Sequence, residues 1–387
     1  MRCRLPLFGC MRKHESGFSL PVPDGGLYDF VAVGALMKVP LLKRRTPPFR
    51  IDPDELDRID IREREAAARS LYRRLRGAAR LAAIAVWVPT SVGFEACLLL
   101  VPGTAKIRWT RVIWGVICKL LSLKLNVIGR RAGTVGGARA RARGDRPVIY
   151  VSNHSTWLDV PVLGTILPSV FVAKGDIEHW PIMGLVSKIG RTIFVSRQRN
   201  TTGRERDEMI SRLADGDNLV LFPEGTSSDG SRVLPFMSAF FAIAKPPRLR
   251  NADAQEVGIT FPPGMVPLIQ PVSVVYDQLD GLPIGRARRP VFAWYGDMEL
   301  GPHLWQLVKW RSMRASVLLH PPLDPDDFPS RKALAQATWR AVTSGAAELR
   351  QNVQPEAPEW ELKPASPAAD IRGNDKASLD RTRPSFA

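Results

Sequence analysis

The sequence predicts an α/β protein with a mostly parallel sheet covered by helices, preceded by an N-terminal membrane-associated helical segment. From residue 123 onward, short apolar runs alternate with amphipathic runs, which is the pattern of a parallel sheet covered on both faces. Ahead of that region, the apolar run at residues 81–102 is about as long as the roughly 20 residues that span a bilayer. We therefore expect one α/β domain behind a membrane segment.

These patterns divide the 387 residues into four segments. Glycine, proline and basic residues interrupt every apolar run in residues 1–53, so we expect a disordered extension there. Residues 54–122 hold a basic helix followed by spanning or interfacial helices, and residues 123–350 form the α/β domain. Proline, alanine, serine and charged residues dominate residues 351–387, where we expect a disordered tail.

The first ordered segment begins with a helix over residues 54–76, where acidic residues come early and arginines late, as the helix dipole prefers. The run at 81–102 has three interpretations: a membrane-spanning helix first, a half-inserted or interfacial hairpin second, and a buried soluble helix third. Pro89 is expected to kink this helix, and Glu95 is costly in hydrocarbon. If the helix spans, the arginines before it place the N-terminus in the cytoplasm.

The remaining elements are expected in alternation. Residues 106–125 carry an apolar stripe beside Trp109 and Trp114, which fits an amphipathic helix at the membrane interface and equally a surface helix of the domain. We expect strands at 123–129, 147–153, 191–197, 217–225 (with a loop), 266–276, 289–296 and 314–320, and helices at 180–190, 204–216 and 330–350.

Composition narrows the partners without choosing among them. The formal net charge is +17, which implies an anionic partner such as nucleic acid, an anionic membrane surface or a phosphorylated substrate. The four cysteines and five histidines are dispersed, so we expect neither a disulfide framework nor a zinc site.

Several polar residues lie at the carboxyl end of the strand expected at 147–153. His154 lies at its carboxyl end, where α/β sheets form ligand crevices, and Asp159 follows five residues later. This spacing lets the carboxylate fold back onto the imidazole, fix its tautomer and raise its basicity. Such a pair is a base with an orienting group and no nucleophile of its own. The spacing alone also fits a structural histidine capped by a nearby aspartate.

Two further segments place polar groups at strand ends. In VLFPEGTSSDGSR (220–232), an apolar strand breaks at Pro223 into a small polar loop containing Glu224 and Gly225, which is either a binding loop or a tight turn. In RTIFVSRQRN (191–200), a strand ends with Arg197 and Arg199, which suit phosphate or carboxylate binding, or a solvated basic loop.

Together these segments resemble the glycerolipid acyltransferase family, typified by 1-acylglycerol-3-phosphate O-acyltransferases, over about residues 85–320. NHSTWLD matches the family's N-H-x(4)-D block, which implies that His154 is the general base and Asp159 its orienter. Four blocks occur in the family's order after an apolar N-terminal segment, which makes the resemblance specific.

The other three blocks imply binding roles. Residues 174–197 resemble the second block, FPEGT at 222–226 the third, and IQPVSVVY at 269–276 the fourth. The resemblance assigns acceptor binding to Arg197, Glu224, Gly225 and Thr226, and the acyl pocket or its support to Asn153, Pro181, Gly184 and Pro271.

The resemblance implies direct acyl transfer in membrane-lipid biosynthesis. A lysolipid hydroxyl attacks the thioester of acyl-CoA or acyl carrier protein while His154 removes the hydroxyl proton. Oxyanion donors are required, and the sequence does not identify them. The resemblance implies no metal and no bound cofactor, and it places the enzyme at a bacterial inner membrane with its catalytic domain facing the cytoplasm.

One departure from the family bears on the acceptor. The third block usually reads FPEGTR, and that arginine is thought to hold the phosphate of lysophosphatidate; here the position is Ser227. The segments FPEGTSSDG, DGLPIGR (280–286) and RPVFAWYGDMEL (289–300) look more like the bacterial branch that acylates lyso-ornithine lipid. Lyso-ornithine lipid is therefore favoured as acceptor, with lysophosphatidate as the alternative.

Two other classes compete with this interpretation. A Ser-His-Asp lipid esterase needs a serine within reach of the base, often on a G-x-S-x-G elbow, and the sequence has no such elbow. A nucleic-acid-binding protein would explain the net charge. However, much of the basic excess flanks the apolar segments near tryptophans, which fits an anionic membrane surface better.

Overall fold

The computed structural model describes residues 53–101, 103–174, 192–195, 202–244, 266–353 and 355–361, with side chains from Ser70 onward except at 138, 141, 173–174, 194–195 and 202–206. By its internal contacts the chain divides into Met1–Ile61 and Arg62–Ala387, and every contact reported below lies within the second unit. Residues 1–52 of the expected extension and the helix expected at 180–190 lie outside the described residues.

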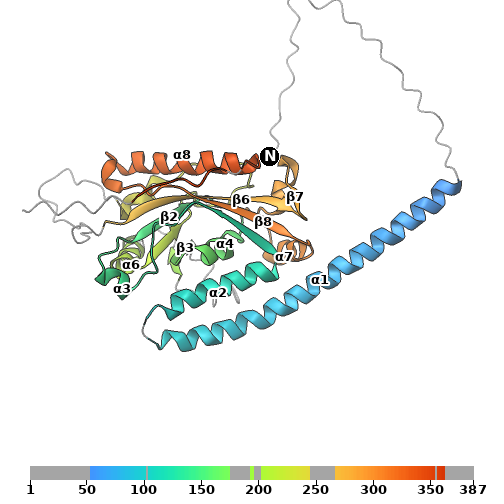
Figure 1. Ribbon diagram of the computed structural model, residues 1–387, viewed down its shortest axis with the longest axis horizontal. Coiled ribbons are helices and arrows are strands. Elements are labelled where there is room, and N and C mark those ends of the chain that lie inside the picture. Colours follow the sequence, from blue (N-terminus) through green and yellow to red (C-terminus); the bar gives the residue numbers. More distant parts are fainter. Residues whose placement is uncertain are drawn as a thin grey trace, which may run out of the picture. The chain divides into compact units, whose positions relative to one another are not determined.

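The centre of the protein is a mixed, mostly parallel sheet (Figure 1). Its strands are β1 (Leu123–Ile128), β2 (Val148–Ser152), β3 (Ser169–Lys174), β4 (Ile193–Val195), β5 (Asn218–Leu221), β6 (Leu268–Leu279), β7 (Leu282–Pro283) and β8 (Met313–Leu319). The order across the sheet is β1-β8-β6-β2-β5-β3-β4, and β7 pairs with β6. Only the β6–β8 and β6–β7 pairs among the described strands are antiparallel, so the predicted fold class is confirmed.

Helices cover both faces of the sheet. They are α1 (Pro53–Leu99), α2 (Ala105–Leu120), α3 (Ala138–Ala142), α4 (Asp159–Ile166), α6 (Thr202–Ala214), α7 (Leu300–Val308) and α8 (Arg331–Arg350), with 3₁₀ helices η2 (Ser238–Ile243), η3 (Arg286–Val291) and η4 (Pro325–Asp327). Side chains of α2, α4 and α7 form one core cluster with the sheet, and those of α6, η2 and α8 contribute to the cluster on the other face. Figure 1 shows α8 and α2 on opposite sides of the sheet.

The sequence of β2 explains why this strand is central. Val148 and Tyr150 belong to the core cluster on the α2 side, whereas Ile149 and Val151 belong to the cluster on the opposite face. All of these residues are buried, as expected for a strand between two parallel neighbours whose successive side chains point to opposite faces. A continuous apolar run is therefore required there, and its polar end becomes the site.

Helix α1 joins two segments that the sequence suggested separately. It continues without interruption through Pro89 to Leu99. Arg80 donates hydrogen bonds to the carbonyls of Val308, Trp310 and Arg311, at and just after the end of α7, where a helix leaves carbonyls without a partner. These bonds fasten α1 to the core cluster on the α2 side of the sheet.

The same helix carries the candidate membrane segment. Ser70–Leu99 is long and apolar enough to cross a membrane, and only 11% of its most apolar window is buried. Exposed side chains on and just after it include those of Val86 and Leu100. Helix α2 lies against α1: the ring of Trp109 meets the ring of Phe94 edge-on, with centroids 4.5 Å apart. The apolar run thus forms one arm of a helical hairpin.

Three local differences from the expected elements are informative. The strand expected at 289–296 is wrong: its first residues continue the 3₁₀ helix η3, and Phe292 stacks on Tyr276 with ring centroids 5.1 Å apart. Pro290 has no N–H group to donate to a neighbouring strand. The apolar residues that follow it are buried without being paired in the sheet, so their sequence resembles that of a strand. Strand β3 and helix α7 were not expected, although the apolar run SVFVAK fits a buried strand.

Candidate active site

The candidate site lies where β2 ends. Both neighbours of this strand, β5 and β6, run parallel to it, so their carboxyl ends meet at the same edge. A loop of six residues, 153–158, connects β2 to α4 and contains His154, and Asp159 is the first residue of α4. The short connection brings the histidine and the aspartate together.

His154 and Asp159 form a close pair. The Nδ1 atom of His154 lies 2.9 Å from Oδ2 of Asp159; the aspartate side chain is completely buried, and the imidazole is 22% exposed. The backbone N–H groups of Ser155 and Thr156 donate to the same Oδ2 at 2.8 and 3.1 Å. Three contacts hold this carboxylate, so when Nδ1 carries the proton, Nε2 is the nitrogen that can accept one.

A residue from a distant strand completes the carboxylate's contacts. The hydroxyl of Tyr276, in β6, donates to Oδ1 of Asp159 at 2.8 Å. Burial raises the pKa of the Tyr276 phenol well above its ordinary value, and the charge of Asp159 raises it further, so Tyr276 remains a donor. The two residues are 117 positions apart, and no sequence spacing pointed to this contact.

Glu224 connects the loop after β5 to the histidine loop. Its Oε1 accepts the backbone N–H of His154 at 2.8 Å, and its Oε2 accepts the N–H of Leu234 at 2.9 Å. Burial raises the pKa of Glu224 to about 7, and these two backbone N–H groups oppose the shift. The sequence predicted acceptor binding for Glu224; its observed contacts are those of a brace between two loops, and the binding role remains a prediction.

The rest of the FPEGT segment shapes the wall beside the imidazole. The Phe222 ring stacks on His154, with centroids 4.3 Å apart and an angle of 24° between the planes. Gly225 has φ +69°, and a Cβ atom there would come within 2.2 Å of the Met237 side chain, so the turn favours glycine. Gly225 and Thr226 are exposed, as a surface available to a substrate requires.

Two predicted supporting residues lie on the strands behind the site. The side chain of Asn153 donates to the carbonyl of Val274 at 2.9 Å and accepts its N–H at 2.8 Å, which extends the β2–β6 pairing by one rung. Pro271 is buried in β6 opposite Val151. The three other predicted residues, Arg197, Pro181 and Gly184, lie outside the described residues. Their roles remain predictions.

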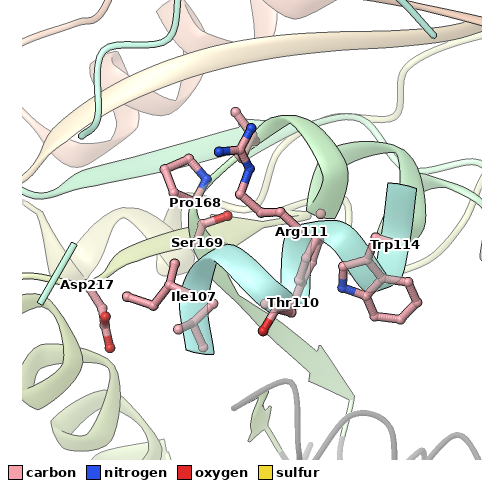
Figure 2. A pocket seen from close by; sticks show the side chains of 11 residues that line it. Ile107, Thr110, Arg111, Trp114, Pro168, Ser169 and Asp217 are labelled. Atoms are coloured by element: carbon pink, nitrogen blue, oxygen red, sulfur yellow. The ribbon is translucent and has the colours of Figure 1, made fainter. Parts of the chain in front are cut away.

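A pocket elsewhere in the protein is not part of this site. Figure 2 shows it between α2 and the start of β3, with Arg111, Ser169 and Asp217 among its lining residues. Ser169 begins β3 and Asp217 precedes β5, whereas His154 follows the end of the parallel strand β2. This pocket therefore lies at the opposite edge of the sheet.

No grouping of three or more His, Cys, Asp or Glu side chains suited to a metal ion occurs in the described parts of the chain. The described site offers a histidine base held by a carboxylate, and backbone groups that fix the surrounding loops. Such an arrangement can remove a proton from a hydroxyl brought to Nε2 of His154.

Comparisons with known proteins agree with this chemistry. Residues 134–265 match the model of the family described as Acyltransferase. A lyso-ornithine lipid O-acyltransferase of Rhizobium meliloti (strain 1021) is 34% identical over 68% of this chain and 83% of its own length. A 1-acyl-sn-glycerol-3-phosphate acyltransferase of Neisseria gonorrhoeae is 28% identical over 52% of this chain and 71% of its own length.

The crystal structure of the 1-acyl-sn-glycerophosphate acyltransferase PlsC of Thermotoga maritima superimposes with a TM-score of 0.49 at 18% identity, covering 76% of this chain and 100% of that one. The chain belongs to the acyltransferase family, and it is an enzyme that transfers acyl groups. Within the family it is similar to enzymes named as acyltransferases of lyso-ornithine lipid and of 1-acyl-sn-glycerol-3-phosphate.

Proposed function

We propose that this enzyme transfers a fatty acyl group from an acyl thioester to the free hydroxyl of lyso-ornithine lipid, with His154 as general base. The observation that carries the mechanism is the 2.9 Å contact between Nδ1 of His154 and the buried carboxylate of Asp159. Because that contact occupies Nδ1, Nε2 takes the proton from the acceptor hydroxyl. Asp159 stabilises the imidazolium that forms.

The transfer proceeds without an acyl-enzyme. The deprotonated acceptor oxygen attacks the thioester carbonyl, and the carbon–sulfur bond breaks as the tetrahedral intermediate collapses. The departing thiolate, of CoA or of acyl carrier protein, receives the proton that His154 carries. Ser155, the serine next to the base, is buried and donates its backbone N–H to Asp159, which favours direct transfer over an esterase mechanism.

The choice of acceptor rests on Ser227 and on the relatives. Ser227 occupies the position where 1-acylglycerol-3-phosphate O-acyltransferases usually have an arginine that holds the acceptor phosphate. Lyso-ornithine lipid, the acceptor in the name of the Rhizobium meliloti relative, has no phosphate and does not require that arginine. Lysophosphatidate is the second candidate, supported by the weaker similarity to the Neisseria gonorrhoeae enzyme. Arg197 and the contacts of Glu224 are compatible with either lipid.

The membrane side of the proposal rests on the α1–α2 hairpin. Its exposed apolar residues, such as Val86 and Phe94, support insertion of the hairpin into one leaflet, with residues 123–350 as the catalytic domain at the cytoplasmic face of the inner membrane. Both the lysolipid and the membrane-bound product remain in the bilayer, so an anchored enzyme meets its acceptor there.

The test is an assay of the full-length protein in detergent with labelled acyl donor, comparing lyso-ornithine lipid with lysophosphatidate. We expect preferential acylation of lyso-ornithine lipid, lost in His154→Ala, and a gain in lysophosphatidate use in Ser227→Arg. A wild-type preference for lysophosphatidate would overturn the acceptor assignment. Acylation by His154→Ala at the wild-type rate would overturn the mechanism.

A further inference from the structure

Two arginines line a small crevice next to the catalytic loop. The crevice is bounded by Asn153 and Ser155, which flank His154, and by Gly230 from the loop after β5. Arg289, from η3, and Arg350, the last residue of α8, supply its only charged lining side chains among the described residues. Two segments that are distant in the sequence, η3 and the end of α8, thus bring two positive charges next to the loop that carries His154.

The arginines are coupled to each other and are not neutralised by a direct ion pair. Nη2 of Arg289 donates to the backbone carbonyl of Arg350 at 3.0 Å, which ties the two segments together. Nε of Arg350 is buried and has no hydrogen-bond partner in the described part of the chain. Neither guanidinium forms an ion pair among the described residues. Because Nε of Arg350 is enclosed, an anion in the crevice would be bound through the remaining N–H donors of the two guanidinium groups.

One of the charges that act on Arg350 belongs to the site already described, namely Glu224. Burial lowers the pKa of Arg350, and the nearby Arg289 charge lowers it further, whereas Glu224 and Asp229 act in the opposite direction. Like charges held near each other are stabilised by an anion placed between them. Glu224 also accepts the backbone N–H of His154, so the carboxylate that interacts with Arg350 also contacts the histidine loop.

We propose that Arg289 and Arg350 bind the carboxylate of the acceptor's ornithine headgroup and so place the acceptor hydroxyl at His154. This inference rests on the proposed function. The crevice takes the role of the family's third-block arginine, whose position is Ser227 here. In lyso-ornithine lipid the carboxylate and the hydroxyl of the amide-linked chain are separated by only a few bonds, which matches a carboxylate site beside the base. A guanidinium binds a carboxylate through two parallel hydrogen bonds, which fixes orientation as well as position.

The experiment compares the full-length protein in detergent with three acceptors: lyso-ornithine lipid, its carboxyl methyl ester, and lysophosphatidate. The variants are Arg350→Gln, Arg289→Gln and Arg350→Lys, which keeps the charge and loses the fork. Arg288→Gln is the matched control, because Arg288 is an exposed neighbour in the same short helix. Thermal unfolding of each variant checks that the fold is retained.

We expect Arg350→Gln and Arg289→Gln to raise KM for lyso-ornithine lipid about tenfold to a hundredfold, as for the loss of a charged hydrogen bond, with kcat much less affected. Arg350→Lys should recover part of the loss. Wild-type enzyme should show a similar rise in KM for the methyl ester, and the Gln variants should add little to it. Arg288→Gln should behave as wild type with every acceptor.

Equal KM values for the free acid and the ester in the wild type would overturn the carboxylate site. An equal rise in KM for lyso-ornithine lipid and for its methyl ester in Arg350→Gln would also overturn it, because a purely structural role of Arg350 predicts that result. Failure of the proposed function is a different outcome: wild-type enzyme would acylate lysophosphatidate and leave lyso-ornithine lipid unused. That result would overturn the carboxylate assignment together with the acceptor.

Discussion

Two carboxylates of the described chain are completely buried in regions of opposite character. Asp159, at the edge of the sheet that carries His154, receives hydrogen bonds from two backbone N–H groups and the Tyr276 hydroxyl, and it contacts the His154 ring. Glu95, in the apolar half of α1, accepts a hydrogen bond from the hydroxyl of Thr110 on α2. The edge at His154 surrounds its carboxylate with polar donors, whereas α1 and α2 shield the Glu95 carboxylate between them.

This difference shows how burial serves two purposes. A buried carboxylate with several donors stays charged and fixes the group that it contacts, which is what a histidine base requires. A buried carboxylate between two helices fixes how those helices face each other. Glu95 counted against a membrane segment in the sequence, but it points toward α2 while Val86 and Phe94 remain exposed. Glu95 is therefore shielded by α2, and the choice between a spanning and a half-inserted segment stays a prediction.

The largest effect is expected at the catalytic carboxylate. Asp159→Asn removes the charge that orients and stabilises the imidazolium, so kcat should fall about 10²- to 10⁴-fold. Steady-state kinetics of the detergent-purified protein measure this. Asp326→Asn is the control, because it makes the same chemical change at an exposed carboxylate in η4. An Asp159→Asn enzyme with near-wild-type kcat would remove the basis for contrasting the two carboxylates.

A smaller effect is expected where the hairpin joins the domain. Arg80→Ala deletes the bonds to the carbonyls after α7 and leaves those acceptors without their charged donor, at a cost of about 2 kcal/mol. The midpoint of thermal unfolding should fall accordingly. Arg74→Ala is the control, because Arg74 is exposed on the same helix. Equal shifts for the two variants would show that the attachment of α1 does not depend on these carbonyl contacts.

The smallest effect is expected from Tyr276→Phe, which removes one donor to Asp159 while keeping the ring that stacks on Phe292. Activity should fall about tenfold, the equivalent of one charged hydrogen bond. Steady-state kinetics of the detergent-purified variant measure this, and thermal unfolding checks that the fold is retained. Wild-type kcat in Tyr276→Phe would show that the Tyr276 hydroxyl is not needed to hold Asp159.

The sequence by itself determined the local features of this protein. The alternation of apolar runs predicted the covered, mostly parallel sheet, because side-chain periodicity follows directly from backbone geometry. The five-residue spacing of His154 and Asp159 predicted their contact, because one short loop at the end of a strand joins them. The apolar pattern also predicted the helical segment before the domain, which consists of α1 and α2.

Only the tertiary structure decided the contacts between distant segments. Tyr276 reaches Asp159 across 117 positions and Arg80 reaches the carbonyls after α7 across about 230, because the order of strands in the sheet and the docking of α1 place them together. Arg289 and Arg350 meet at the crevice for the same reason. The strand wrongly expected at 289–296 belongs here too, because Phe292 and Ala293 are buried by packing beside β6 and not by pairing in the sheet. Periodicity encodes which face of an element is buried, and only packing determines what lies opposite that face.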